Sequence, residues 1–181
     1  MSFDDLFLEE VRRRLPDVDV VARRATVDPG RRVDPRVARD EAGAIDTLAV
    51  ETLVERWRAF FPRESAPADL RLRWVPTSTT DSVGAEAAAR QPGFAGVAAA
   101  RLDRIGALLD AEDWSWTRLD PPGDGNVRIV GRRRQVGFDL GIRPGDDVVL
   151  LRTRTVAVVV GELAGELVET PVEVRPWSAS R

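Results

Sequence analysis

The stretch VGFDLGI, from Val136 to Ile142, decides the fold. Large apolar side chains occupy every second position of this stretch, and Gly137, Asp139 and Gly141 stand between them. Successive side chains of a strand point to opposite faces of a sheet, so the pattern predicts a strand with one face on a core and the other in solvent. Such a strand needs a second layer packed on its apolar face.

Further strands are predicted around this one, each bounded by turn residues. Proline, glycine and aspartate separate them, as in Pro121 to Asn126 and Pro144 to Asp147. Turns this short allow only antiparallel pairing, because a parallel crossover needs a dozen or more residues. The predicted strands cover 70–75, 114–119, 127–130, 136–142 and a last segment from 148 that either runs to 160 or breaks near Thr155.

Helical periodicity dominates the first part of the chain. The predicted helices cover 3–15, 45–61, an alanine-rich segment from Asp81 or Ser82 to the residue before Pro92, 94–112 and, near the end, 161–169. Between the first two, residues 18–21 suit a short strand, and the turn signals include Asp34-Pro35. The arginine-rich segment 22–39 is either a solvated connector or a mobile loop that binds a partner, and 171–181 is expected to be an extended tail anchored by Trp177.

These elements predict one α+β domain over 1–181: a mainly helical part to about 112, antiparallel strands over about 113–160, and a C-terminal helix and tail over 161–181. We expect helices packed on one face of a four- to five-stranded antiparallel sheet, with the other face partly open or used for association. Hydrophobic residues make up 43% of the 181, which is enough for a substantial core.

The amino-acid composition excludes several kinds of catalytic and metal site. The chain lacks cysteine, histidine, tyrosine and lysine, and all 27 of its basic residues are arginine. Thiolate nucleophiles, imidazole bases, ordinary zinc sites and lysine Schiff bases are therefore excluded. Neighbouring acids such as Asp146 and Asp147 lack the further ligands of a calcium loop, and Gly123 to Asn126 lacks the lysine of a phosphate-binding loop. We expect no metal and no cofactor.

Charge and hydropathy set the expected location. The net charge is −3, so no overall field draws nucleic acid or anionic lipid, and neither is expected as a partner. The acidic start, Met1 to Asp5, is unlike a signal peptide, and the longest apolar run, Val156 to Val160, is too short to span a bilayer. We expect a cytoplasmic protein. The absence of lysine fits the codon usage of a GC-rich bacterium, or avoidance of lysine-directed modification.

A segment in the second half resembles a known kind of domain. It reads Leu108-Leu109, then Trp114-Ser115-Trp116, Gly123-Asp124-Gly125, Val136-Gly137-Phe138 and Val148-Val149-Leu150. Over 107–159 this order is similar to a small domain common in actinobacterial proteins, including some cell-envelope lipoproteins. The lipobox cysteine of that family is absent here, as is the Thr-Pro-Cys that often follows its last strand. The resemblance implies a helix-on-sheet layout and no activity.

Arginines on strands form the candidate binding surface. They alternate with apolar residues, so several should emerge on the face away from the core, where guanidinium groups suit carboxylate or phosphate. The alternative is that they only keep the sheet from aggregating. Asp139, between two glycines, could form a polar site with Arg128 or Arg152. The candidate residues are Arg71, Arg73, Arg118, Arg128, Asp139, Arg152 and Arg154.

Three classes of function follow. The favoured one is a non-enzymatic interaction or assembly protein, such as an adaptor, a chaperone-like or an immunity protein, with a protein partner and no catalytic residues. The second is a small-ligand protein or a carboxylate- and arginine-dependent enzyme with its site near Asp139. The third is a structural subunit of a larger assembly. The oligomeric state is left open, homo-oligomers included.

Overall fold

The computed structural model describes residues 33–61, 66–120 and 125–177, which belong to one compact unit, 32–181. The helices are α2 (Pro35–Phe60), α3 (Ala95–Ala99), α4 (Leu102–Ala111) and α5 (Leu163–Glu169). The strands are β1 (Asp69–Pro76), β2 (Ser82–Pro92), β3 (Ser115–Leu119), β4 (Val127–Arg133), β5 (Val136–Arg143), β6 (Val148–Thr155), β7 (Val158–Val159) and β8 (Glu173–Pro176).

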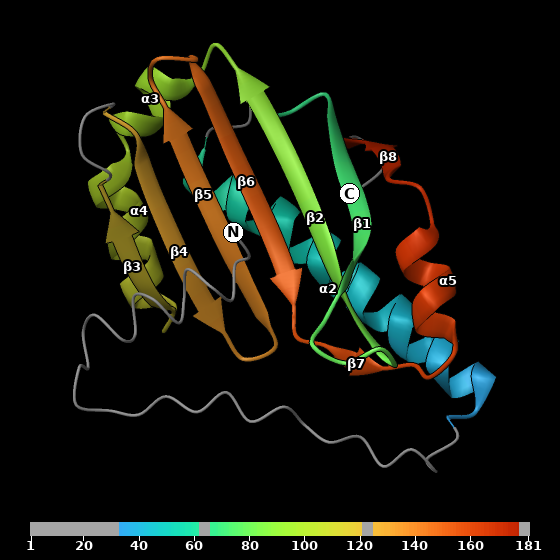
Figure 1. Ribbon diagram of the computed structural model, residues 1–181. Helices are drawn as coiled ribbons and strands as arrows, with labels where there is room; N and C mark the ends of the chain where they lie inside the picture. Colours follow the sequence, from blue (N-terminus) through green and yellow to red (C-terminus); the bar gives the residue numbers. More distant parts are fainter. Residues whose placement is uncertain (1–32, 62–65, 121–124, 178–181) are drawn as a thin grey trace. The chain divides into compact units, whose positions relative to one another are not determined.

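All described strands join one antiparallel sheet in the order β3-β4-β5-β6-β2-β1-β8, and β7 pairs with β2 (Figure 1). The predicted α+β class and the antiparallel sheet are confirmed. The predicted count of four to five strands is too low, because the sheet has eight. The additional strands come from an alanine-rich segment and from the C-terminal part of the chain.

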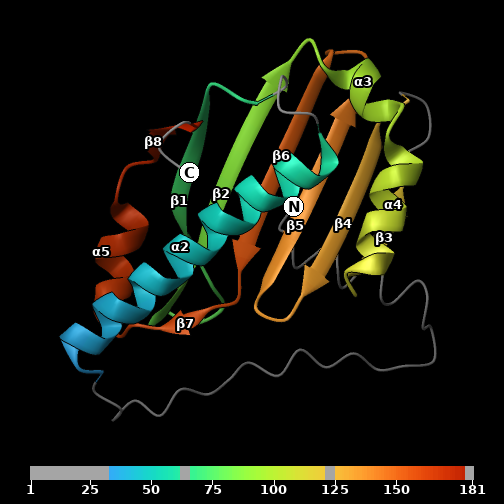
Figure 2. The same cartoon turned by 180° about the vertical axis from the view of Figure 1, so that it is seen from behind.

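The sheet has two unlike faces. Figure 2 shows α2 running across one of them, with the shorter helices on the same side. We call this the helix face and the opposite one the outer face. On β5 the residues from Val136 to Ile142 follow the predicted alternation, with Phe138 buried on the helix face and Asp139 on the outer face.

The prediction of a helix before Pro92 is wrong, since Ser82–Pro92 forms β2 near the centre of the sheet. Ala85, Ala87 and Ala89 are buried on the helix face, where α2 packs on β2 and β6. Alanine favours helices, but here its small side chain lets a helix lie close to the sheet, and tertiary packing overrides the local preference. The hydroxyl of Thr153 on β6 donates to the carbonyl of Ala49 on α2 at 2.7 Å.

Helix α2 begins ten residues earlier than predicted. The Asp34-Pro35 pair, interpreted as a turn, is the start of this helix: the Asp34 side chain accepts from the backbone N–H of Arg36 at 2.8 Å, and Pro35 occupies the first turn. Proline suits that place because its missing N–H would have no helical partner there. The prediction of a connector or mobile loop over 22–39 is therefore wrong for residues 35–39, which are helical. Residues 22–32, the predicted helix 3–15 and the predicted strand 18–21 lie outside the described residues.

The remaining elements follow the predictions with adjustments. The helix expected over 94–112 is broken near Ala100 into α3 and α4, and α5 occupies most of 161–169. The tail contains β8, which pairs with β1, and Trp177 is buried with its ring 5.9 Å from that of Trp57. The tail as far as its anchor Trp177 is thus part of the fold, and 178–181 lie outside the described residues.

Candidate functional site

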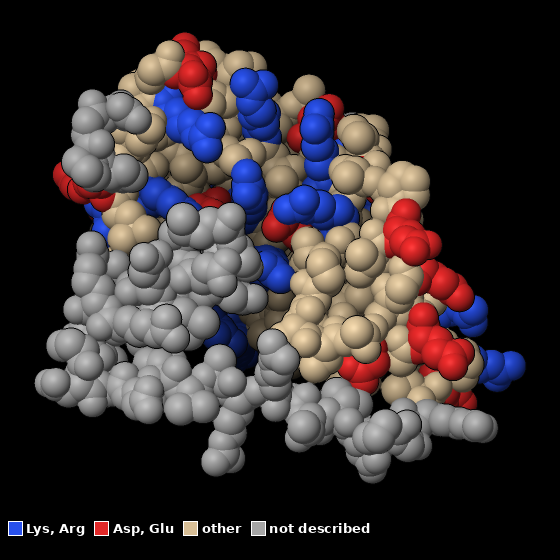
Figure 3. Space-filling view, viewed as in Figure 1, with Lys and Arg blue, Asp and Glu red and all other residues tan. Residues whose placement is uncertain are grey.

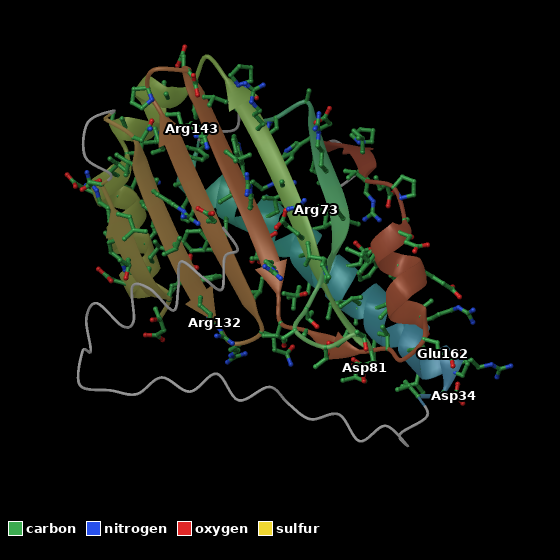
Figure 4. The ribbon with its side chains drawn as sticks, in the orientation of Figure 1. Asp34, Arg73, Asp81, Arg132, Arg143 and Glu162 are labelled. Atoms are coloured by element: carbon green, nitrogen blue, oxygen red, sulfur yellow. The ribbon has the colours of Figure 1, made fainter. Side chains whose placement is uncertain are left out.

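Most of the candidate arginines gather on the outer face. The burial alternation of β1, β4 and β6 turns their apolar residues to the core and these arginines away from it. Figure 3 shows basic side chains spread over the described part of this face, and Arg73, Arg132 and Arg143 mark its extent in Figure 4. We define the arginine face by its outward members: Arg71, Arg73, Arg90, Arg128, Arg132, Arg143, Arg152 and Arg154.

Arg118 does not belong to this surface. On the edge strand β3 it lies opposite Ile129, a core residue of the helix face, and its Nε donates to Asp120 at 2.9 Å. Sequence reasoning also missed three members of the arginine face. Arg90 lies in the segment interpreted as a helix, and Arg132 lies in one interpreted as a turn; Arg143 follows the predicted strand directly. Strand alternation extended by two residues would have found the last two.

Asp139 forms a two-pronged ion pair. Arg128 Nε donates to its Oδ1 at 2.8 Å and Nη2 to its Oδ2 at 2.7 Å. The predicted pairing with Arg128 is therefore present, whereas Arg152, directly opposite Asp139 on β6, makes no ion pair with it. Since both carboxylate oxygens are occupied and the pair is partly buried, the group is held as a structural clamp between β4 and β5.

Glu86 on β2 repeats this arrangement. It lies between Arg73 on β1 and Arg154 on β6, and it pairs with Arg73, whose Nη2 is 2.6 Å from Oε1. Arg154 instead donates to the Pro76 carbonyl at 3.5 Å. Each of these two central carboxylates is thus already held by one arginine. Within the described part of the chain, the following members of the arginine face have neither an ion pair nor a side-chain hydrogen bond: Arg71, Arg90, Arg132 and Arg152.

One further arginine, Arg56 of α2, lies inside the protein. Its guanidinium is 2.6 Å from Glu112 at the end of α4 and stacks near the rings of Phe60 and Trp114, at 5.8 and 5.3 Å. Its side chain is only 7% exposed. A buried guanidinium needs such partners to offset its desolvation, so this group links α2 to α4.

The described residues contain neither a metal-binding cluster nor a membrane-spanning helix. Among the residues described, no three acidic side chains are grouped so as to hold a metal ion. No helix in the described ranges has the length and apolar character needed to cross a bilayer.

Comparison with protein-family models, with curated proteins and with solved structures finds no match to this chain. The resemblance of 107–159 to a small actinobacterial domain therefore stays a prediction. The arginine face is the feature from which a function is inferred.

Proposed function

We propose that this protein is a non-enzymatic interaction component of the bacterial cytoplasm that binds an acidic partner protein through its arginine face. The observation that carries the proposal is a group of arginines that form no ion pair with the described residues, on a sheet face that none of the described helices covers. Guanidinium groups bind carboxylates in pairs of parallel hydrogen bonds, so the partner should present acidic side chains.

Charge segregation distinguishes this face from an ordinary solvated one. The whole chain carries a net charge of −3, yet arginines outnumber carboxylates on the outer face. A surface that only needs solubility is served by mixed charges. A surplus of the sign opposite to the net charge steers partners of complementary charge and fixes their orientation.

The arginine face also contains apolar positions. Val130 on β4 and Leu150 on β6 point outward and are half-buried between arginines. Interfaces combine arginine anchors with apolar contacts in this way, because guanidinium stems and aliphatic side chains lose water together. In contrast, the Asp139 carboxylate is occupied by Arg128, and nothing observed favours a reaction there.

The test compares two charge-matched variants. In the first, Arg71, Arg90, Arg132 and Arg152 are changed to glutamine; in the control, the exposed helix residues Arg36, Arg39, Arg58 and Arg104 are changed in the same way. The partner captured by the wild-type protein from its host is identified, purified and titrated against all three. We expect at least a tenfold weaker binding for the first variant only, with an affinity that falls as salt rises.

Equal loss in both variants, or in neither, would refute the proposal. Turnover of a small molecule that is lost on Asp139→Ala would replace it with the enzymatic alternative. Light scattering after size-exclusion chromatography gives a third readout: a defined high-order oligomer whose assembly survives the first variant would favour the structural-subunit alternative.

A further inference from the structure

Ala88 lies at the centre of the least compensated part of the arginine face. It points outward from β2, directly opposite Arg71 on β1 and Arg152 on β6. Arg90 stands two residues further along the same strand and points the same way. Neighbouring strands are about 4.8 Å apart, so Arg71 and Arg152 each lie one strand spacing from Ala88, and Arg90 lies two residues along β2 on the same side.

Ala88 carries only a methyl group between positions that carry long side chains, and it is partly exposed on the outer face. Its fourth neighbour on this face is Glu86, whose carboxylate is engaged by Arg73. Among the described residues, no carboxylate forms an ion pair with Arg71, Arg90 or Arg152.

We infer that this cluster, the Ala88 site (Arg71, Arg90 and Arg152 around Ala88), binds the phosphate monoester of a phosphorylated serine or threonine on the partner protein. The inference rests on the proposed function and narrows its acidic partner to a phosphorylated one. A carboxylate has one charge and two oxygens, which two guanidinium groups already satisfy. A phosphoryl group carries a charge of about −1.5 to −2 and has three acceptor oxygens. It therefore suits three guanidinium groups better than a carboxylate does.

The position of the site on a sheet face favours a phosphate carried by a protein over a free one. A small molecule on a sheet face buries little of its own surface, whereas sites for small ligands are concave. A phosphorylated segment of a partner would also contact the neighbouring parts of the arginine face, including Leu150. These contacts add affinity that inorganic phosphate cannot obtain.

The test uses four defined probes. Three are fluorescent nonapeptides of alanine and glycine with phosphoserine, glutamate or serine at the centre, and the fourth is inorganic phosphate as a competitor. We expect the phosphoserine peptide to bind at least tenfold tighter than the glutamate peptide, the serine peptide not to bind, and inorganic phosphate to compete only weakly. Arg71→Gln, Arg90→Gln and Arg152→Gln should each weaken phosphopeptide binding about tenfold, whereas Arg39→Gln on α2 should not change it.

Ala88→Leu supplies a variant that keeps every charge. The larger side chain occupies the space between Arg71, Arg90 and Arg152 on the solvent side of the sheet. The protein should therefore remain folded while phosphopeptide binding is lost. Binding that survives this change, or survives Arg152→Gln, would overturn the inference. So would equal affinity for the phosphoserine and glutamate peptides, no binding of any peptide, or inorganic phosphate competing as well as the peptide.

These outcomes are separable from failure of the proposed function. The captured partner is treated with phosphatase before titration. If it still binds, and the variant of four glutamines still loses it, the acidic-partner proposal stands and the phosphate inference fails. If the four-glutamine variant binds the partner normally, both fail.

Discussion

At the scale of single residues, the outer face shows how one carboxylate selects between two arginines. Asp139 lies directly opposite Arg152 in the β5–β6 register, but it is Arg128 that reaches it from β4 with two hydrogen bonds. Two parallel N–H···O bonds match the carboxylate geometry better than a single contact does. Arg152 is left without an ion pair among the described residues, and its guanidinium is therefore available to the site proposed around Ala88.

A double-mutant cycle on Arg128 and Asp139 measures this selection. Their side chains are 27% and 19% exposed, so solvent screens the pair only in part, and we expect a coupling free energy of about 1 kcal/mol. The matched control is Arg118 with Asp120, which are 41% and 58% exposed and should couple by less than about 0.5 kcal/mol. Urea unfolding of the single and double alanine variants gives both values, and equal coupling in the two pairs would contradict the clamp.

At the scale of elements, β2 determines how close the two layers lie. Helix α2 carries large side chains, so it can lie close to the sheet only where the sheet residues facing it are small. Ala85, Ala87 and Ala89 of β2 are such residues. The same segment carries Ala88 and Arg90 on the opposite side. One strand therefore serves both as the floor under α2 and as the centre of the arginine face.

Leucine substitutions at adjacent positions test this double role. Ala87→Leu inserts a large side chain where no exposed surface remains, and overpacking should lower the free energy of unfolding by about 3 kcal/mol. Ala88→Leu faces solvent and should change it by less than about 0.5 kcal/mol. Chemical denaturation measures both. Similar losses at the two positions would mean that the segment does not alternate between core and solvent.

At the scale of the whole molecule, the C-terminal strand is fastened to the first described helix by charge. Arg175 on β8 donates to Asp46 of α2 at 3.2 Å and to Glu173 on its own strand at 2.8 Å. The hydrogen bond from Arg175 holds the pKa of Glu173 below its ordinary value of 4.5, against the opposing effect of desolvation. The link joins residues that lie more than a hundred positions apart in the sequence.

This lowered pKa predicts a pH dependence. A carboxyl with a depressed pKa in the folded state contributes stability above its unfolded value near 4.5, and the contribution disappears as pH falls through the folded value. Glu173→Gln should therefore be slightly less stable than the wild type at pH 7 and equally stable near pH 3. The effect is small because the Glu173 side chain is 54% exposed. Urea unfolding at both pH values measures it, and Glu169→Gln, on the exposed side of α5, should show no such change.

Much of this architecture was readable from short stretches of sequence. Alternating apolar residues and tight turns predict the hairpins from β3 to β6. The same alternation on the strands predicts that five arginines point outward: Arg71, Arg73, Arg128, Arg152 and Arg154. The start of α2 was misread because Asp-Pro serves equally as a turn and as a helix start. The prediction of a helix at β2 is wrong because alanines favour a helix locally, whereas here they form a strand on which α2 packs.

The sequence by itself determined the class of the fold, the antiparallel hairpins from β3 to β6 and which side of β1, β4, β5 and β6 is apolar, because all three depend on neighbours within a few residues. Only the tertiary structure decided the eight-strand order, the pairing of Asp139 and Glu86 with particular arginines, and the convergence of Arg71, Arg90 and Arg152 on Ala88. The strand order and the place of Arg152 beside Ala88 depend on the pairing of β2 with β6, which lie far apart in the chain. The two ion pairs join consecutive strands, but the register offers each carboxylate more than one arginine. Local periodicity states which way a side chain points, whereas only the packed sheet states what stands beside it.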